Sequence, residues 1–149
     1  MRLSLIAFLG LLSACSGLKT YPTAAGGNLA VRTQMDGNVR AALHIHTVDA
    51  QCRTEYRGSV QLDRPSLVLD LPAGRPSYVV VTFDTSSFLG GSRSTSAGTL
   101  LEPRSGSRYE LSVSYRESLY DVVLSQSDSK GGQRRALPRR ELEACRTRS

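Results

Sequence analysis

The sequence predicts an all-β domain, a sandwich of about eight short strands, with a small barrel as the alternative fold. Three observations lead to this prediction. Apolar and polar residues alternate with a period of two along most of the chain, as they do in half-buried strands. Turn residues interrupt these runs at the short spacings typical of sandwiches and barrels. No long stretch carries the periodicity of an amphipathic helix.

The first two expected strands cover residues 29–34 and 39–47. An Asp-Gly dipeptide at 36–37 lies between them and predicts a hairpin turn. Alternation in the second strand turns its apolar residues toward the core. The same alternation places His44 and His46 together on the opposite face.

Further strands are expected along the rest of the chain, at 56–62, 67–71, 77–83, 99–102, 109–115 and 119–127. In the first of these, Tyr56 and Gly58 share the core-facing set with Val60 and Leu62 by simple alternation. Residues 77–83 are the most continuously apolar run of the chain and are rich in β-branched side chains, which predicts a central strand covered on both faces. Residues 88–98 are rich in Gly and Ser and are expected to form a loop that carries binding contacts.

The C-terminal residues 138–145 are the one stretch in which we expect two turns of helix, because Pro138 suits the first helical position. The prediction for this end of the chain is therefore a short helix or coil, held to the domain by a disulfide.

The N-terminus has the organisation of a signal peptide over residues 1–14. One positive charge at Arg2 precedes the apolar run Leu3–Leu12, which is too short to span a bilayer stably. The run ends in Leu12-Ser13-Ala14-Cys15, which resembles the lipobox of bacterial lipoproteins.

This resemblance implies cleavage before Cys15, diacylglyceryl modification of its thiol and acylation of the new amine. Ser16 in the next position implies sorting to the outer membrane. The alternative is an ordinary secretory signal cleaved after Ala14. A lipoprotein would be attached to the membrane by its N-terminal acyl chains.

The expected organisation is then a signal peptide at 1–14, a lipidated N-terminus with a flexible tether at 15–28, a sandwich at 29–128 and a basic tail at 129–149. The tether prediction rests on the aperiodic stretch Ser16–Gly27, which ends in Gly-Gly.

Lipidation of Cys15 leaves Cys52 and Cys145 as the two remaining cysteines. In an oxidising compartment each has only the other as a partner, so we predict a Cys52–Cys145 disulfide. The alternative is a pair of buried free thiols. No metal site is expected from cysteines so far apart.

The formal charge of +6 is unevenly distributed. Basic and acidic residues balance from Cys15 to Ser129, whereas seven basic residues face two acidic ones from Lys130 onward. The possible contacts for an anionic partner are Lys130, Arg134, Arg135, Arg139 and Arg140. The alternative is a solvated end in a chain that uses Arg far more than Lys.

Catalytic and metal chemistry has little support in the sequence. His44 and His46 share a strand face and are weak metal-ligand candidates, with Asp49 as the nearest third ligand. No G-x-S-x-G motif is present, and the acidic pairs Asp63/Asp70 and Glu110/Asp121 are expected to be exposed. We expect no enzyme activity and no cofactor.

Two further resemblances complete the prediction. The order of turns and strands through the middle of the chain is similar to small Ig-like or transthyretin-like sandwiches of envelope lipoproteins. Ser105-Gly106-Ser107-Arg108-Tyr109 resembles the inhibitory loop of lipoprotein-type lysozyme inhibitors.

The expected function is that of a non-enzymatic, periplasm-facing lipoprotein of the outer membrane. It would bind an envelope protein or an anionic envelope polymer, and not nucleic acid. Inhibition of a cell-wall hydrolase such as lysozyme is the alternative.

Overall fold

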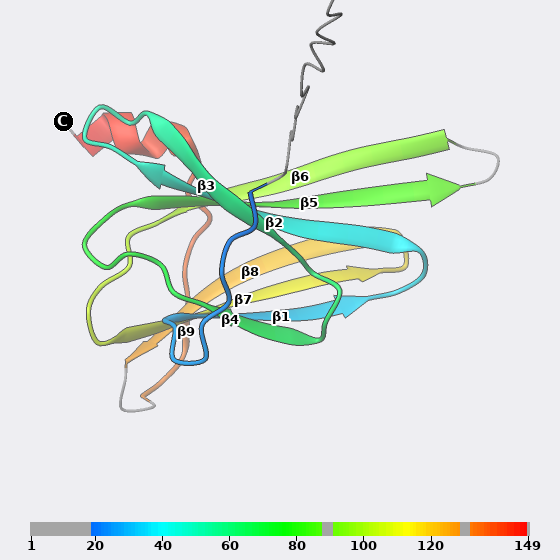
Figure 1. Ribbon diagram of the computed structural model, residues 1–149, viewed down its shortest axis with the longest axis horizontal. Helices are drawn as coiled ribbons and strands as arrows, with labels where there is room; N and C mark the ends of the chain where they lie inside the picture. Colours follow the sequence, from blue (N-terminus) through cyan, green and yellow to red (C-terminus); the bar gives the residue numbers. More distant parts are fainter. Residues whose placement is uncertain (1–18, 88–90, 129–131, 149) are drawn as a thin grey trace, which may run out of the picture.

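A computed structural model describes residues 19–87, 91–128 and 132–148. Its strands are β1 (Leu29–Met35), β2 (Val39–Val48), β3 (Thr54–Gln61), β4 (Ser66–Leu69), β5 (Ser77–Ser87), β6 (Gly91–Leu101), β7 (Ser107–Arg116), β8 (Leu119–Asp128) and β9 (Arg135–Ala136), and a 3₁₀-helix, η1 (Leu142–Arg148), follows. One sheet has the order β4-β1-β7-β8-β9 and the other β3-β2-β5-β6 (Figure 1). The predicted all-β sandwich is confirmed and the barrel alternative is wrong, because the sheets do not close on each other.

The core lies between the two sheets and takes alternate residues from each strand. Leu29 and Leu111 from one sheet meet the layer that contains Leu43, Ile45 and Phe83 of the other, and all five side chains are almost completely buried. Burial of one such side chain stabilises the fold by roughly 1.5–3 kcal/mol. The period-two pattern therefore reports correctly which residues face inward.

The central position of β5 is confirmed, because it pairs with β2 on one side and β6 on the other. Its expected burial on both faces is wrong. Val79 and Val81 are buried in the core, whereas the outward residues Tyr78, Val80 and Thr82 are only half-buried. A two-layer sandwich covers only the inner face of each sheet, even where the sequence is apolar on both.

The Asp-Gly turn does not form the expected hairpin. β1 pairs with β4 and runs parallel to β7, whereas β2 belongs to the other sheet. Gly37, with φ of 72°, reverses the chain so that it passes from one layer to the other. The apolar residues of β1 and β2 therefore face each other across the core instead of lying side by side.

A β-bulge in β3 changes the face of Tyr56. Ile45 pairs with Gly58, but the neighbouring His46 pairs with Tyr56, so Arg57 is left without a cross-strand partner. Because a one-residue insertion reverses the inward and outward sets, Tyr56 lies on the outer face beside His46, not in the core with Val60 as expected. Gly58 adopts φ of 145° at the bulge.

The expected loop at 88–98 is strand over most of its length. Residues 91–98 belong to β6, which pairs with β5 in an unbroken antiparallel register from Gly91 to Leu101. Residues 88–90 lie outside the described part of the chain. Ser and Thr can form a strand when a long neighbouring strand supplies backbone hydrogen-bond partners. Here the backbone hydrogen bonds to β5 outweigh the weak strand preference of Gly.

The described part of the expected tether is attached to the domain. Ser59 N donates to the Lys19 carbonyl (2.8 Å), and Ala24 N donates to the Val68 carbonyl (2.9 Å). Tyr21 packs on the core, and its hydroxyl donates to the Asp70 carbonyl (2.6 Å). Residues 19–24 thus form hydrogen bonds with backbone groups on the edges of both β3 and β4. The prediction of a flexible tether is wrong for these residues.

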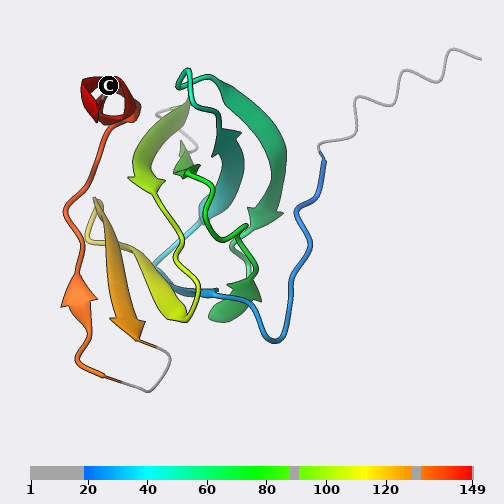
Figure 2. The ribbon, with the colours of Figure 1, turned by 90° about the vertical axis from the view of Figure 1, so that its left-hand side faces the viewer.

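The C-terminal segment joins the two sheets at the opposite side (Figure 2). Leu137 N donates to the Leu124 carbonyl of β8 (2.8 Å), and the Arg140 carbonyl accepts from Leu100 N of β6 (2.7 Å). The N-terminal and C-terminal segments therefore fasten the sandwich along two different sides.

The predicted disulfide is confirmed, with Cα atoms of Cys52 and Cys145 5.8 Å apart. Asp49 shapes the turn that presents Cys52: its Oδ1 accepts from the backbone N–H groups of Gln51 and Arg53, each at 2.9 Å. Cys52 itself has φ of 61°. The disulfide fixes η1 over Val48 and Leu100, where Cys145 and Leu142 complete a second small core. The expected C-terminal helix is thus a 3₁₀-helix that begins at Leu142, later than predicted.

Candidate functional site

Glu110 lies at the centre of a group of arginines on the outer face of the five-stranded sheet. Its side chain is 10% exposed. Arg134 donates to it through both amino groups, Nη1 to Oε1 at 2.8 Å and Nη2 to Oε2 at 3.0 Å, and Arg32 Nε donates to Oε2 at 2.8 Å. The prediction that Glu110 is exposed is therefore wrong, because the two guanidinium groups cover its carboxylate.

Three separate segments build this arrangement. β1 lies parallel to β7, which places Arg32 diagonally next to Glu110. Ala136 pairs with Ser125, and by alternation Arg134, two residues before Ala136, lies on the same face of the sheet. A carboxylate that accepts three charge-assisted hydrogen bonds holds its partners in fixed positions.

The surrounding face is basic and polar. Alternation along β7 places Arg108 and Arg116 on the same side of the sheet as Glu110, with Ser112 and Ser114 between them. We call Arg32, Arg108, Arg116 and Arg134 the arginine face. Glu110 lies among them, and Asp121 lies on the same face, opposite Ser114.

The arginine face has the chemistry of an anion-binding surface. The side chains of Arg32 and Arg134 are 64% and 60% exposed although both contact Glu110. A guanidinium group has five N–H donors in a planar fork that suits phosphate and carboxylate oxygens. Glu110 orients two of these forks and leaves them accessible from solvent.

The basic residues predicted in the tail do not form one patch. Arg134 belongs to the arginine face. The exposed Arg135 does not, because it pairs with Gln126, whose side chain lies on the opposite side of the sheet. Arg139 Nε donates to the Gly98 carbonyl, and Arg140 forms an ion pair with Glu102 at 3.4 Å. Lys130 lies outside the described residues, as does Cys15.

His44 and His46 share the outer face of β2, as expected, but other contacts occupy them. His44 Nε2 lies 3.1 Å from Thr82 Oγ1, and the ring of His46 lies 5.3 Å from that of Tyr56. Burial, followed by the nearby charge of His44, lowers the pKa of His46 below its ordinary value. Asp49 is engaged with Arg53 instead, and the described residues contain no cluster of three metal-ligating side chains.

The turn at residues 105–109 ends in a core side chain. Tyr109 is 3% exposed, and its hydroxyl accepts from Arg104 N at 3.0 Å. This contact closes the turn from the core side, and Tyr109 has almost no exposed surface with which to contact a partner.

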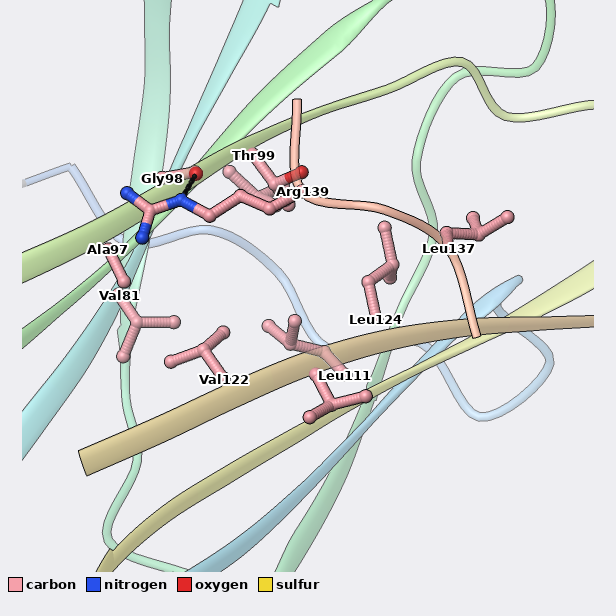
Figure 3. A pocket seen from close by; sticks show the side chains of 11 residues that line it. Val81, Ala97, Gly98, Thr99, Leu111, Val122, Leu124, Leu137 and Arg139 are labelled. Atoms are coloured by element: carbon pink, nitrogen blue, oxygen red, sulfur yellow. Dashed lines mark hydrogen bonds between the residues drawn. The ribbon is translucent and has the colours of Figure 1, made fainter. Parts of the chain in front are cut away.

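A cavity of about 140 Å³ lies between the two sheets where β6 and β8 form their edges (Figure 3). Its walls include Val81 and Ala97 from the four-stranded sheet and Leu111, Val122 and Leu124 from the other. The stem and guanidinium of Arg139 extend over this space beside Gly98 (Figure 3). No sequence pattern pointed to it, because its walls are ordinary core residues and it exists only where two strand edges are left apart.

Comparisons with protein-family models, curated proteins and solved structures found no match to this chain. Among the described residues, no helix is long and apolar enough to cross a membrane.

Proposed function

We propose that this protein is a lipid-anchored component of the bacterial cell envelope that binds an anionic polymer through its arginine face without catalysing a reaction. The observation that carries this proposal is the contact of Arg32 and Arg134 with Glu110. A buried carboxylate holds two exposed guanidinium groups in fixed positions, and guanidinium groups held in this way can bind phosphate or carboxylate groups. In an envelope these groups belong to lipid headgroups and lipopolysaccharide.

The anchor in this proposal is an acylated Cys15, on the basis of the lipobox resemblance. The domain begins its backbone contacts at Lys19. The four residue-to-residue steps from Cys15 to Lys19 cover at most about 14 Å, at 3.3–3.6 Å per step. An anchored domain would therefore lie close to the membrane surface, where charges of this kind contribute roughly 1 kcal/mol each.

Inhibition of a cell-wall hydrolase receives no support from the turn that first indicated it. Tyr109, the last residue of that turn, belongs to the core. Anion binding also accounts for the arginines of β1 and β7, which the inhibitor interpretation leaves without a role.

The test uses the full chain with Cys15→Ser, so that acyl chains do not drive binding. Co-sedimentation with vesicles that contain phosphatidylglycerol, and with lipopolysaccharide, measures affinity at several salt concentrations. Arg108→Gln with Arg116→Gln should reduce affinity roughly twentyfold or more, on the basis of about 1 kcal/mol per arginine. Binding should also weaken as salt rises.

The matched control is Arg75→Gln with Arg93→Gln, which removes the same charge from exposed positions outside the arginine face. This pair should retain most of the affinity. Equal losses in the two double variants would mean that net charge alone drives adsorption. Equal binding to anionic and neutral vesicles would overturn the proposal.

A further inference from the structure

The cavity between β6 and β8 is bounded by two strand edges that are only partly paired. Within the described residues, the edge of β6 that faces away from β5 makes one backbone–backbone hydrogen bond, in which Leu100 N donates to the Arg140 carbonyl. β9 pairs with β8 at Ser125 and Gln126, and the following residue, Leu137, donates its N–H to the Leu124 carbonyl. Residues 137–140 cross the gap between these edges, and Leu137 and Arg139 line the cavity, which remains partly open to solvent beside them.

The walls of the cavity are aliphatic. Val81, Leu111, Val122 and Leu124 point toward one another across the space (Figure 3). An apolar cavity of about 150 Å³ holds one benzene molecule in another protein. At about 140 Å³, this cavity suits an apolar group of similar size.

The charged group at this cavity is the guanidinium of Arg139. Arg139 Nε donates to the Gly98 carbonyl at 2.9 Å and lies 3.0 Å from Glu141 Oε1. The contact with Glu141 demonstrates that a carboxylate is accommodated beside this guanidinium. Both side chains of the pair are more than half exposed, and such surface pairs are weak and readily exchanged for another partner.

We propose that the cavity binds a small carboxylate with one benzene-sized apolar group, such as an arylacetate or a short branched-chain acid. The apolar group lies among Val81, Leu111 and Leu124, and the carboxylate replaces that of Glu141 on Arg139. Pockets that bind small molecules commonly combine apolar walls with a few such polar groups. This site is separate from the arginine face and does not depend on its function.

The test is calorimetric titration of the full Cys15→Ser chain with phenylacetate, and with phenylacetamide as the uncharged analogue. We expect phenylacetate to bind more tightly than the amide. Arg139→Gln should weaken phenylacetate binding about tenfold and remove the preference for the charged ligand, because a charge-assisted hydrogen bond is lost. Glu141→Gln should strengthen binding, because it removes the competing carboxylate.

Ala97→Leu should abolish binding, because the larger side chain extends from the wall into the cavity. Val122→Phe fills the same space from the opposite sheet and replaces Ala97→Leu if that variant does not fold. Retained binding in a folded cavity-filling variant would overturn the proposal, as would absence of binding to the parent chain. Arg108→Gln with Arg116→Gln serves as the control and should bind phenylacetate normally, even if vesicle binding fails.

Discussion

The guanidinium of Arg134 and the carboxylate of Glu110 form a two-pronged ion pair, 2.8 and 3.0 Å long, between residues 24 positions apart in the chain. The pair fastens the C-terminal segment to the outer face of the five-stranded sheet. It also joins the strongly basic end of the chain to arginines in β1 and β7. The arginine face is therefore a property of the fold and not of the tail alone.

Replacement of Glu110 by Gln should have opposite effects on stability and on anion binding. Arg32 and Arg134 would lose a shared partner, which should lower the free energy of unfolding by about 1–2 kcal/mol, since charged hydrogen bonds at half-exposed groups are worth this order. Anionic vesicles should bind more strongly, because both guanidinium groups become available. Urea denaturation and co-sedimentation measure the two effects.

Asp121→Asn is the matched control for Glu110→Gln. It removes one negative charge from the same face at an exposed position. Stability should change little. If Glu110→Gln leaves stability unchanged, or weakens vesicle binding while it remains folded, Glu110 does not organise the arginine face.

Local patterns in the sequence predicted which residues face the core, but not which strands are neighbours. Alternation at Leu29 and Leu43 gives the inward direction of each side chain, which depends only on the pleat. The choice of partner strand depends on contacts across the core. For this reason the Asp-Gly turn at 36–37 was expected to form a hairpin, although it connects two sheets.

The arginine face was only partly predictable for the same reason. Charge counted along the chain balances from Cys15 to Ser129, so the distribution of charge in the sequence does not distinguish Arg32 or Arg108 from other arginines. Folding brings Arg32 to Glu110 through the parallel pairing of β1 with β7, which nothing in the local sequence specifies. The bulge before Gly58 similarly moved Tyr56 to the face of His46.

Loss of the Cys52–Cys145 bond should destabilise the domain substantially. The bond closes a loop with a sequence separation of 93. Chain-entropy arguments give about 4.7 kcal/mol for a loop of 100 residues, so a reductant should lower the free energy of unfolding by about 3–5 kcal/mol. Urea denaturation with and without reductant measures the difference. Cys52→Ser with Cys145→Ser should be equally destabilised and insensitive to reductant; a parent chain insensitive to reductant would contradict the prediction.

His46 should make the fold less stable in mild acid. Its pKa in the folded state is lowered, chiefly by burial, so folding favours the neutral ring. The contribution to stability is fully present above the ordinary pKa of 6.5 and is lost as pH falls below it. NMR titration should place the midpoint of His46 below 6.5.

His44→Gln separates the two causes of this shift. Removal of the neighbouring charge should raise the pKa of His46 part of the way toward 6.5, because burial is the larger cause. A midpoint at or above 6.5 in the parent chain would be inconsistent with a partly buried His46.

Gly58→Ala should release the N-terminal segment from β3. An added Cβ would lie 2.8 Å from the Lys19 carbonyl oxygen and 2.9 Å from Tyr21 N, at a backbone φ of 145°. We expect a loss of at least about 1–3 kcal/mol, because strained backbone and steric overlap add. Hydrogen exchange at Tyr21 N, which donates to the Ser59 carbonyl, should become much faster.

Gly26→Ala is the control for this substitution, since an added Cβ there meets no atom within 4 Å. Its stability and its exchange at Tyr21 N should match those of the parent chain. Unchanged exchange in Gly58→Ala would show that residues 19–21 are not held on the edge of β3.

Intact-mass spectrometry of the protein from the membrane fraction of a bacterial host tests lipid anchoring most directly. The account predicts a chain that begins at Cys15 and carries a diacylglyceryl group and an amide-linked acyl chain, with no thiol open to alkylation before reduction. A soluble chain that retains Met1, or one that begins at Cys15 without added lipid, would contradict it.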